Sequence, residues 1–422
     1  MAKIAPFKAL RFTEKAGKSR ELCCPPYDII SEEQRKNYLA ENPHNIIRLE
    51  LPKEGQDPYK EAQSCLQSWM EEGLLKKDET PAIYIYEEEF MVENISYKLR
   101  GFICSVHLEE FSKGIVLPHE ETLSKAKEDR FNLMCATECN FSQVYSLYDD
   151  SDNAVESILQ TLCTDTPATT FTDDDQVTHR LWVVKDGKEV QTIVSLFADK
   201  KLYIADGHHR YETALRYKQH RIDQGLELGT SDSMMMFLCS LQNKGLVVFP
   251  THRVIQNTKG FESGDFLAKA KDYFYVTKLD SFSSISEELK TVYDGNGKAF
   301  GYFDGKDSYL LVMKDISVMA SLLPNASKAL RELDVTLLHT VLLEDYFGIN
   351  KEVMAAGGRL TYTRDMQEAK DLVDGGADCC FILNPTRVSE IRDVALAGEK
   401  MPQKSTYFYP KLITGLVMNK LV

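Results

Sequence analysis

Short apolar, β-rich runs alternate with helical patterns from one end of this chain to the other, and this order restricts it to folds that mix helices and strands. The clearest example is a β-rich run over Leu202–Ala205, which leads through Asp206-Gly207 into a helical pattern over Arg210–Arg221. We therefore expect an α/β fold of the mixed α+β type.

The same periodicities predict further elements. Helical spacing over Pro58–Leu75 predicts a helix, and two β-rich runs between residues 82 and 111, joined by Glu93-Asn94, predict a hairpin. The Thr-rich stretch around Asp173-Asp174-Asp175 is expected to be a solvated loop, because it combines a charge run with turn-forming residues.

The length of 422 residues suggests two domains, because single hydrophobic cores stop growing at roughly 250–300 residues. We place the boundary near residue 257, which divides the chain into residues 1–256 and residues 257–422. The last segment of the second domain is a candidate to return to the functional site.

Charge and hydropathy exclude several classes of function. The 64 acidic and 50 basic residues give a formal net charge of -14, the wrong sign for a protein that binds nucleic acid by neutralising phosphates. The chain has no apolar run of the roughly 18 residues that a membrane span needs, and it begins with no signal-peptide pattern. We therefore expect a cytoplasmic protein without a membrane partner, in which the ten cysteines are reduced thiols.

The turn made by Asp206, Gly207, His208, His209 and Arg210 carries the strongest chemical signal. It delivers donors to a helix N-terminus, where backbone N–H groups are free and the helix dipole is positive, an arrangement that suits a phosphate. Gly207 allows close approach, and Arg210 can bind two phosphate oxygens. Asp206 can orient a histidine, cap the helix or hold a metal ion. The alternative is an ordinary helix cap followed by exposed histidines.

Other candidate residues lie far away in the sequence. Residues 118–122, Pro-His-Glu-Glu-Thr, precede Lys125, Lys127 and Arg130, and a binding function and ordinary surface chemistry explain this segment equally well. Thr251-His252-Arg253 is expected to end a buried strand. Residues 404–411 mix hydroxyl groups, aromatic rings and lysines.

Common catalytic signatures are missing from the sequence. It contains no Walker A sequence, no G-x-G-x-x-G, no H-E-x-x-H and no G-x-S-x-G. The adjacent residues His208 and His209 point in different directions in most backbones, so we expect no metal ion ligated by both and no structural zinc, and we assign no metal ligands.

Several of these segments together resemble the motifs of a bacterial and archaeal family catalogued as domain of unknown function 1015. The resemblance covers nearly the whole chain. It rests on Cys24-Pro25-Pro26-Tyr27-Asp28, Asn45-Ile46-Ile47-Arg48-Leu49, Pro118-His119-Glu120 with Thr122, Asp129-Arg130, Asn140-Phe141-Ser142, Ala205 to Tyr211, Pro250-Thr251-His252-Arg253 and Pro402 to Pro410.

The Asp-Gly-His-His-Arg turn is also similar to the motif of ParB/sulfiredoxin-like phosphate-binding proteins, which include partition proteins, sulfiredoxin and free-serine kinases. This resemblance implies a ParB/sulfiredoxin-like core with insertions in residues 1–256. It also implies that His208, His209 and Arg210 hold the phosphates of a nucleotide or phosphorylated metabolite. In the serine kinases a glutamate is the base toward the serine hydroxyl, and Glu50 and Glu120 are the two candidates here.

Two hypotheses follow. The leading one is phosphoryl transfer on a small hydroxylated metabolite, by a free-serine kinase or by a phosphotransferase or phosphatase that handles O-phosphoserine, with ATP or ADP and Mg²⁺ as cofactors. The alternative is a regulatory module that binds a nucleotide or phosphate without turnover. The expected catalytic residues are Asp206, His208, His209, Glu50 and Glu120, and the expected phosphate-binding residues are Gly207, Arg210, His119, Thr122, Lys125, Arg130, His252, Arg253, Lys404 and Ser405.

Overall fold

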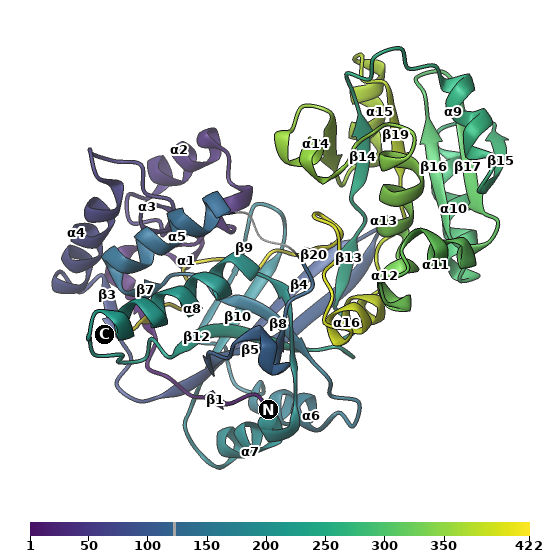
Figure 1. Cartoon of the computed structure of the whole chain (residues 1–422). Coiled ribbons are helices and arrows are strands. Elements are labelled where there is room, and N and C mark those ends of the chain that lie inside the picture. Colours follow the sequence, from purple (N-terminus) through teal and green to yellow (C-terminus); the bar gives the residue numbers. More distant parts are fainter. Residues whose placement is uncertain (121–123) are drawn as a thin grey trace. The chain divides into compact units, whose positions relative to one another are not determined.

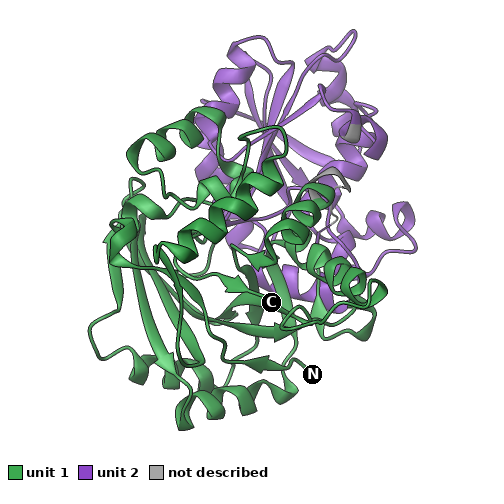
Figure 2. Cartoon of the chain, turned by 90° about the vertical axis from the view of Figure 1, so that its left-hand side faces the viewer, with its two compact units in different colours: residues 1–118, 122–247, 410–422 green, residues 119–121, 248–409 purple. Residues whose placement is uncertain are grey.

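The computed structural model describes residues 1–120 and 124–422, which form two compact units (Figures 1 and 2). Unit 1 consists of Met1–Pro118, Thr122–Val247 and Pro410–Val422, and unit 2 consists of His119–Glu121 and Val248–Tyr409. Both units contain helices and sheets, which confirms the expected mixed α/β class. Residue 257, near which we placed the boundary, lies inside unit 2.

Unit 1 is built on a nine-stranded sheet in the order β6-β11-β8-β12-β5-β4-β10-β9, with β1 paired to β5. The pairs β11·β6 and β12·β8 are parallel and the others are antiparallel. The strands are β1 (Ile4–Ala5), β4 (Ala82–Val92), β5 (Ile95–His107), β6 (Val116–Leu117), β8 (Val144–Tyr148), β9 (Thr169–Thr172), β10 (Thr178–Lys185), β11 (Leu202–Asp206) and β12 (Ser233–Ser240).

Two hydrophobic clusters hold unit 1 together. One joins the large sheet to α6, α7 and α8 through buried side chains such as Phe102, Tyr148 and Tyr211. The other joins α3 and α4 to two short strand pairs through Ile47 and Trp69. The helices are α1 (Ser19–Leu22), α2 (Glu32–Glu41), α3 (Ile47–Glu50), α4 (Pro58–Glu71), α5 (Ser124–Thr137), α6 (Ala154–Leu162), α7 (Lys188–Leu196) and α8 (His208–Asp223), and the short pairs are β2 (Leu10–Phe12) with β3 (Leu75–Lys77) and β7 (Cys139–Asn140) with β21 (Asn419–Lys420).

The local predictions for unit 1 are largely confirmed. The predicted helix is α4, and the predicted hairpin is β4–β5, whose turn residues Glu93 and Asn94 have φ values of 48° and 64°. Positive φ at both central residues is the geometry that a two-residue hairpin turn requires. The loop prediction for the Thr-rich stretch is wrong in part, because Thr169–Thr172 forms the edge strand β9 on β10. Cross-strand hydrogen bonds, rather than composition, decide the structure there.

Unit 2 contains a six-stranded antiparallel sheet in the order β15-β17-β16-β19-β14-β18 and a separate pair, β13 with β20. The expectation that Thr251–Arg253 ends a strand is wrong, because β14 begins at His252 after Pro250 interrupts the preceding run. The strands are β13 (Val247–Phe249), β14 (His252–Ile255), β15 (Phe274–Leu279), β16 (Ala299–Phe303), β17 (Ser308–Met313), β18 (Leu360–Thr363), β19 (Cys379–Ile382) and β20 (Tyr407–Tyr409).

The helices of unit 2 cover this sheet around a core that includes Ile285, Leu289, Ala369 and Val373. None of the helices in the described part of the chain is long and apolar enough to cross a membrane. The helices are α9 (Ser263–Ala270), α10 (Ser284–Asp294), α11 (Met319–Leu322), α12 (Lys328–Arg331), α13 (Asp334–Leu337), the π-helical segment Leu338–Glu344, α14 (Lys351–Ala356), α15 (Met366–Asp374) and α16 (Val388–Leu396).

Candidate functional site

The Asp206–Arg210 turn connects β11 to α8, as the sequence predicted. Gly207 has a φ of 90°, and a Cβ atom at this position would lie 2.9 Å from Nε of Arg210. The left-handed backbone therefore favours glycine here, and a side chain at this position would also displace the guanidinium of Arg210. No side chain caps the first turn of α8, so the interpretation of Asp206 as a helix cap is wrong.

Asp206 is an anchor for two cations. Its Oδ1 accepts a hydrogen bond from Nζ of Lys411 at 2.5 Å, and its Oδ2 accepts one from Nη2 of Arg210 at 2.7 Å. Burial opposes ionisation, but Lys411 and Arg210 outweigh it and hold the pKa of Asp206 well below its usual range. Asp206 is therefore a permanent carboxylate that positions its neighbours.

Arg210 is fixed from two sides. Besides its bond to Asp206, it donates from Nη1 to the backbone carbonyl of Gln143. These two hydrogen bonds use some of the guanidinium N–H groups that we expected to bind phosphate. The remaining N–H groups of the guanidinium are left for a ligand. The neighbouring His208 is buried and His209 is half-buried, which excludes the alternative of two exposed histidines.

Glu50 lies at the end of α3 and is almost completely buried, with 3% of its surface exposed. Its Oε1 accepts a hydrogen bond from Oγ of Ser142 at 2.8 Å. Its Oε2 has no hydrogen-bond partner among the described residues. Burial raises the pKa of Glu50, against the opposing effects of Arg130 and Ser142. A buried carboxyl group of this kind is suited to accept a proton near neutral pH.

Arg130 extends from α5, which lies beside α8 (Figure 1), and connects to Glu50. Its Nη1 donates to the backbone carbonyl of Glu50 at 2.6 Å and lies 3.8 Å from Oε1 of the same residue. It also forms an ion pair with Asp129, and its guanidinium stacks on the ring of Tyr27 at 4.0 Å. Arg130 is therefore a buried cation held in a fixed orientation.

These groups line one small cavity in unit 1. Glu50, Arg130 and Arg210 surround a volume of about 30 Å³. Two further buried atoms of its lining, Oγ1 of Thr213 and Nδ2 of Asn140, have no hydrogen-bond partner among the described residues. Buried polar atoms normally have partners, so this cavity is built to receive a polar group.

In unit 2, His119 and Glu120 contact the segment that contains Lys404 and Ser405. Nε2 of His119 lies 3.0 Å from Oγ1 of Thr406, and Oε1 of Glu120 accepts a hydrogen bond from the backbone N–H of Lys404 at 2.9 Å. The hydroxyl group of Ser405 donates to the carbonyl of Pro402. The four predicted residues His119, Glu120, Lys404 and Ser405 therefore form one group.

His252 and Arg253 of β14 form a second, strongly buried group in unit 2. Arg253 has no exposed surface, donates to the carbonyls of Thr251 and Lys404, and stacks on Tyr362 at 4.7 Å. Its Nε has no hydrogen-bond partner among the described residues. Burial lowers the pKa of Arg253 to about 10 and that of His252 to about 4.

The predicted site residues thus divide between the two units. In unit 1 the structure brings together the Asp206–Arg210 turn, Glu50 and Arg130, whereas the other described candidates lie in unit 2. Thr122 and the side chain of Lys125 lie outside the described residues. The sequence prediction missed Ser142, Thr213 and Lys411. Ser142 and Lys411 belong to segments that we had singled out, but no sequence signal indicated Thr213.

The site residues of unit 1 offer groups for a phosphate but no set of ligands for a metal ion. Among the described residues, no three His, Cys, Asp or Glu side chains are grouped as ligands of a metal ion. Both oxygens of Asp206 already bind cations. The arrangement therefore does not fit a metal ion held by protein side chains alone. The guanidinium of Arg210 at the N-terminus of α8 does fit a phosphate group.

Comparisons with known proteins place the chain in a family and find distant likenesses of fold. The family model described as "Protein of unknown function (DUF1015)" matches residues 4–336. No curated protein matches the chain.

The chain is similar to three solved structures that share little sequence with it. A free serine kinase in complex with AMP is 11% identical, with a TM-score of 0.37 over 76% of this chain and 91% of that chain. A conserved hypothetical protein from Pyrococcus furiosus is 12% identical, with a TM-score of 0.35 over 76% and 95%. SbnI with C-terminal truncation from Staphylococcus aureus is 10% identical, with a TM-score of 0.35 over 75% and 87%.

Proposed function

We propose a function for this chain from the chemistry of its own site. The chain belongs to the DUF1015 family of proteins of unknown function. Unit 1 transfers a phosphoryl group to or from the hydroxyl of a small metabolite, and serine or O-phosphoserine is the concrete substrate. One observation carries this proposal: the buried carboxyl group of Glu50 shares a small cavity with the guanidiniums of Arg130 and Arg210, beside the first turn of α8.

Glu50 is the proposed base. Its Oε2 takes the proton of the substrate hydroxyl, and the hydroxyl oxygen forms a bond to phosphorus. The bond from phosphorus to the leaving oxygen breaks, and the leaving group keeps the electron pair. Burial raises the pKa of Glu50, which makes its carboxylate a stronger base than an exposed glutamate.

The cations are the proposed stabilisers of the phosphoryl group. Arg210 is held by Asp206 and Gln143, and Arg130 is held by Asp129 and the carbonyl of Glu50. Positive groups that are fixed before the reaction stabilise the transition state without having to reorganise. His208 and His209 add donors at the same helix terminus.

The size of the cavity limits what enters it. A volume of about 30 Å³ holds one or two groups of the size of water, so it accepts the hydroxyl end of a substrate. Ser142, Thr213 and Asn140 offer polar partners to that end. The proposed phosphoryl donor is ATP or ADP, and Mg²⁺, carried largely by the donor's phosphates, would neutralise part of their charge.

The test is turnover by the full chain. We would incubate it with serine plus ATP, ADP or pyrophosphate, and with O-phosphoserine alone, each with Mg²⁺ or Mn²⁺, and follow the products by ³¹P NMR. The proposal predicts phosphoserine formation or hydrolysis that Arg210→Ala abolishes and Arg216→Ala retains. Arg216 is the matched control because it lies on the same helix and forms an exposed ion pair with Glu128. Absence of turnover under every condition, with ligand-induced thermal stabilisation, would instead indicate a binding module.

A further inference from the structure

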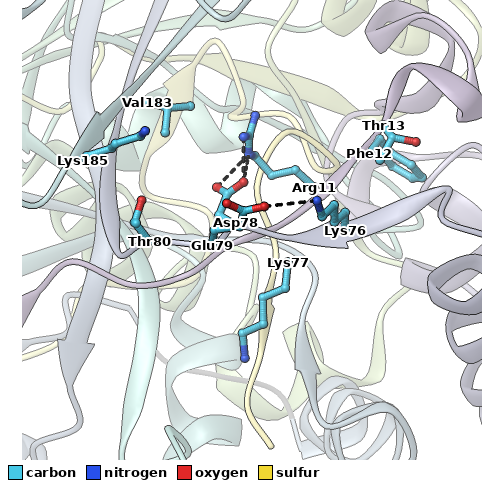
Figure 3. Close-up of a pocket in the computed structure, with 10 residues that line it drawn as sticks. All are labelled: Arg11, Phe12, Thr13, Lys76, Lys77, Asp78, Glu79, Thr80, Val183 and Lys185. Carbon is cyan, nitrogen blue, oxygen red and sulfur yellow. Dashed lines mark hydrogen bonds and ion pairs between the residues drawn. The ribbon is translucent and has the colours of Figure 1, made fainter.

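A second pocket in unit 1 lies where β2, β3 and the turn after β3 meet the end of β10 (Figure 3). Its volume is about 330 Å³, within the roughly 300–1,000 Å³ range of small-molecule sites. None of its lining residues lines the cavity around Glu50. The proposed phosphoryl transfer therefore leaves this pocket without a role.

Arg11 is fixed at the centre of this pocket. Its Nε and Nη2 donate to the carboxylate of Asp78 at 3.0 and 2.7 Å, and Asp78 also accepts a hydrogen bond from the hydroxyl of Tyr84 at 2.7 Å. Nη1 of Arg11 has no hydrogen-bond partner among the described residues. The carboxylate thus holds the guanidinium in one orientation and leaves one of its edges as a donor to the pocket.

Lysines line the pocket around Arg11, and one of them adds a positive charge that no carboxylate pairs with among the described residues. Arg11 is matched by Asp78, and Lys76 lies 3.4 Å from Glu79. The backbones of Lys77 and Lys185 pair with neighbouring strands, but their side chains form no ion pair in the described part of the chain. Figure 3 shows the side chain of Lys185 directed toward the guanidinium of Arg11, whereas Lys77 projects from the other side of the strand. Lys185 therefore adds one unmatched positive charge to the pocket, on a chain whose net charge is -14.

The remaining lining defines the shape of a ligand. Val183 and Phe12 supply apolar surface, and Thr80 supplies a hydroxyl group near Lys185 (Figure 3). An apolar wall with a few convergent polar groups is the usual composition of a metabolite site. We propose that this pocket binds a small dianionic metabolite, a dicarboxylate or a phosphate monoester, whose anionic group lies between Arg11 and Lys185.

The proposal can be tested by isothermal titration calorimetry of the full chain at constant ionic strength. Succinate and glycerol phosphate are the two probes, and sodium chloride is the control for a general salt effect. We expect saturable binding of at least one probe, weakened at least tenfold in Lys185→Gln and unchanged in Lys188→Gln, an exposed lysine of α7 outside the pocket. The probe that binds identifies the type of anion.

Two further results decide the proposal. Binding must persist in Arg210→Ala, because that variant changes only the cavity around Glu50. Three results would each overturn the assignment: Lys185→Gln binds the probe as tightly as the wild type, Arg210→Ala loses binding, or neither probe binds. Turnover of serine is not part of this experiment. Absence of anion binding at this pocket therefore leaves the proposed phosphoryl transfer intact, and absence of serine turnover leaves the assignment of this pocket intact.

Discussion

Both units bury arginine, but they compensate its charge in opposite ways. In unit 1, Arg130 and Arg210 each pair with carboxylates, and Asp206 also binds Lys411. In unit 2, Arg253 forms no ion pair among the described residues; it is held by two carbonyls and the ring of Tyr362, and Glu120 acts on it only as a more distant charge. The buried His339 also lacks compensation of a different kind, because its Nε2 has no hydrogen-bond partner in the described part of the chain.

The presence or absence of a carboxylate partner for the buried arginine distinguishes two kinds of polar site. A compensated network fixes the directions of its groups, and such a network can hold a base and cations in the geometry that a reaction needs. An uncompensated cation costs free energy in the folded chain, and an anionic ligand would remove that cost. The polar network of unit 1 is therefore paired and fixed in direction, whereas the group around Arg253 in unit 2 keeps a buried cation without an ion pair.

The largest effect on stability should come from breaking the compensated network. Arg130→Met removes the partner of the buried Glu50, and loss of one member of a buried ion pair typically costs about 3–5 kcal/mol. Equilibrium denaturation of the full chain should show a loss of this size. Arg20→Met, which removes an exposed arginine of unit 1, should change the free energy of unfolding by less than about 1 kcal/mol. Equal effects of the two variants would contradict the comparison.

As the pH falls, the buried group of His252, Arg253 and His339 in unit 2 should lose stability at a higher pH than the ion pairs of Asp206. Burial lowers the pKa of His252 to about 4 and that of His339 to about 3. Because the unfolded chain takes up these protons near pH 6.5, stability is fully present above that pH and decreases as the pH falls toward 4. Each histidine contributes a slope of up to about 1.4 kcal/mol per pH unit.

The acid slope has a direct test. His339→Gln removes the contribution of His339, so the free energy of unfolding should depend less steeply on pH between 6.5 and 4. A slope that does not change in this variant would show that His339 is protonated in the folded chain. Asp206 behaves differently: its lowered pKa means that its ion pairs lose their stabilising effect only as the pH falls below about 4.

Arg253→Met is the counterpart of Arg130→Met. Because it removes a buried charge that has no carboxylate partner, we expect the free energy of unfolding to stay the same or to increase, by up to about 4 kcal/mol. Chemical denaturation in phosphate-free buffer measures this change. A loss of several kcal/mol would mean that the two carbonyls and Tyr362 compensate Arg253 as fully as carboxylates compensate Arg130.

The smallest effect should come from Lys411, one of the two cations on Asp206. Lys411→Gln leaves the bond from Arg210 to Asp206 in place, so we expect a loss of about 1–2 kcal/mol. The pKa of Asp206 should rise toward its usual value, and the acid transition should begin at a higher pH. An unchanged acid transition would show that Arg210 alone holds Asp206 ionised.

Local features of the sequence predicted more than distant contacts did. The turn at Asp206–Arg210 and the β4–β5 hairpin were predicted because glycine, turn residues and apolar periodicity act over a few positions. The partnership of Asp206 with Lys411 joins residues separated by 205 positions, and no periodicity encodes it. The strand β9 was missed because an edge strand of threonines depends on its partner β10 rather than on its own composition.

The candidate site, too, could be predicted from the sequence only in its local features. Residue chemistry identified Glu50, Arg130 and Arg210, but it did not show that Arg210 is held by Asp206 and the carbonyl of Gln143. It also did not distinguish Glu50 from Glu120 as the candidate base. The structure buries Glu50 beside Ser142, whereas Glu120 accepts a hydrogen bond from the backbone of Lys404 in unit 2. Burial and hydrogen bonding of individual carboxyl groups follow from the tertiary fold and not from local sequence.

The most direct test of the central claim is the rate of phosphoryl transfer in Glu50→Gln. With serine and nucleotide, or with O-phosphoserine, we expect wild-type turnover to fall by about 10²–10⁴-fold when the base is removed. Glu88→Gln is the matched control, because Glu88 is a second buried glutamate of unit 1 whose pKa burial also raises. It should retain turnover. Wild-type rates in a folded Glu50→Gln variant would contradict the role that we assign to Glu50 and, with it, the proposed site.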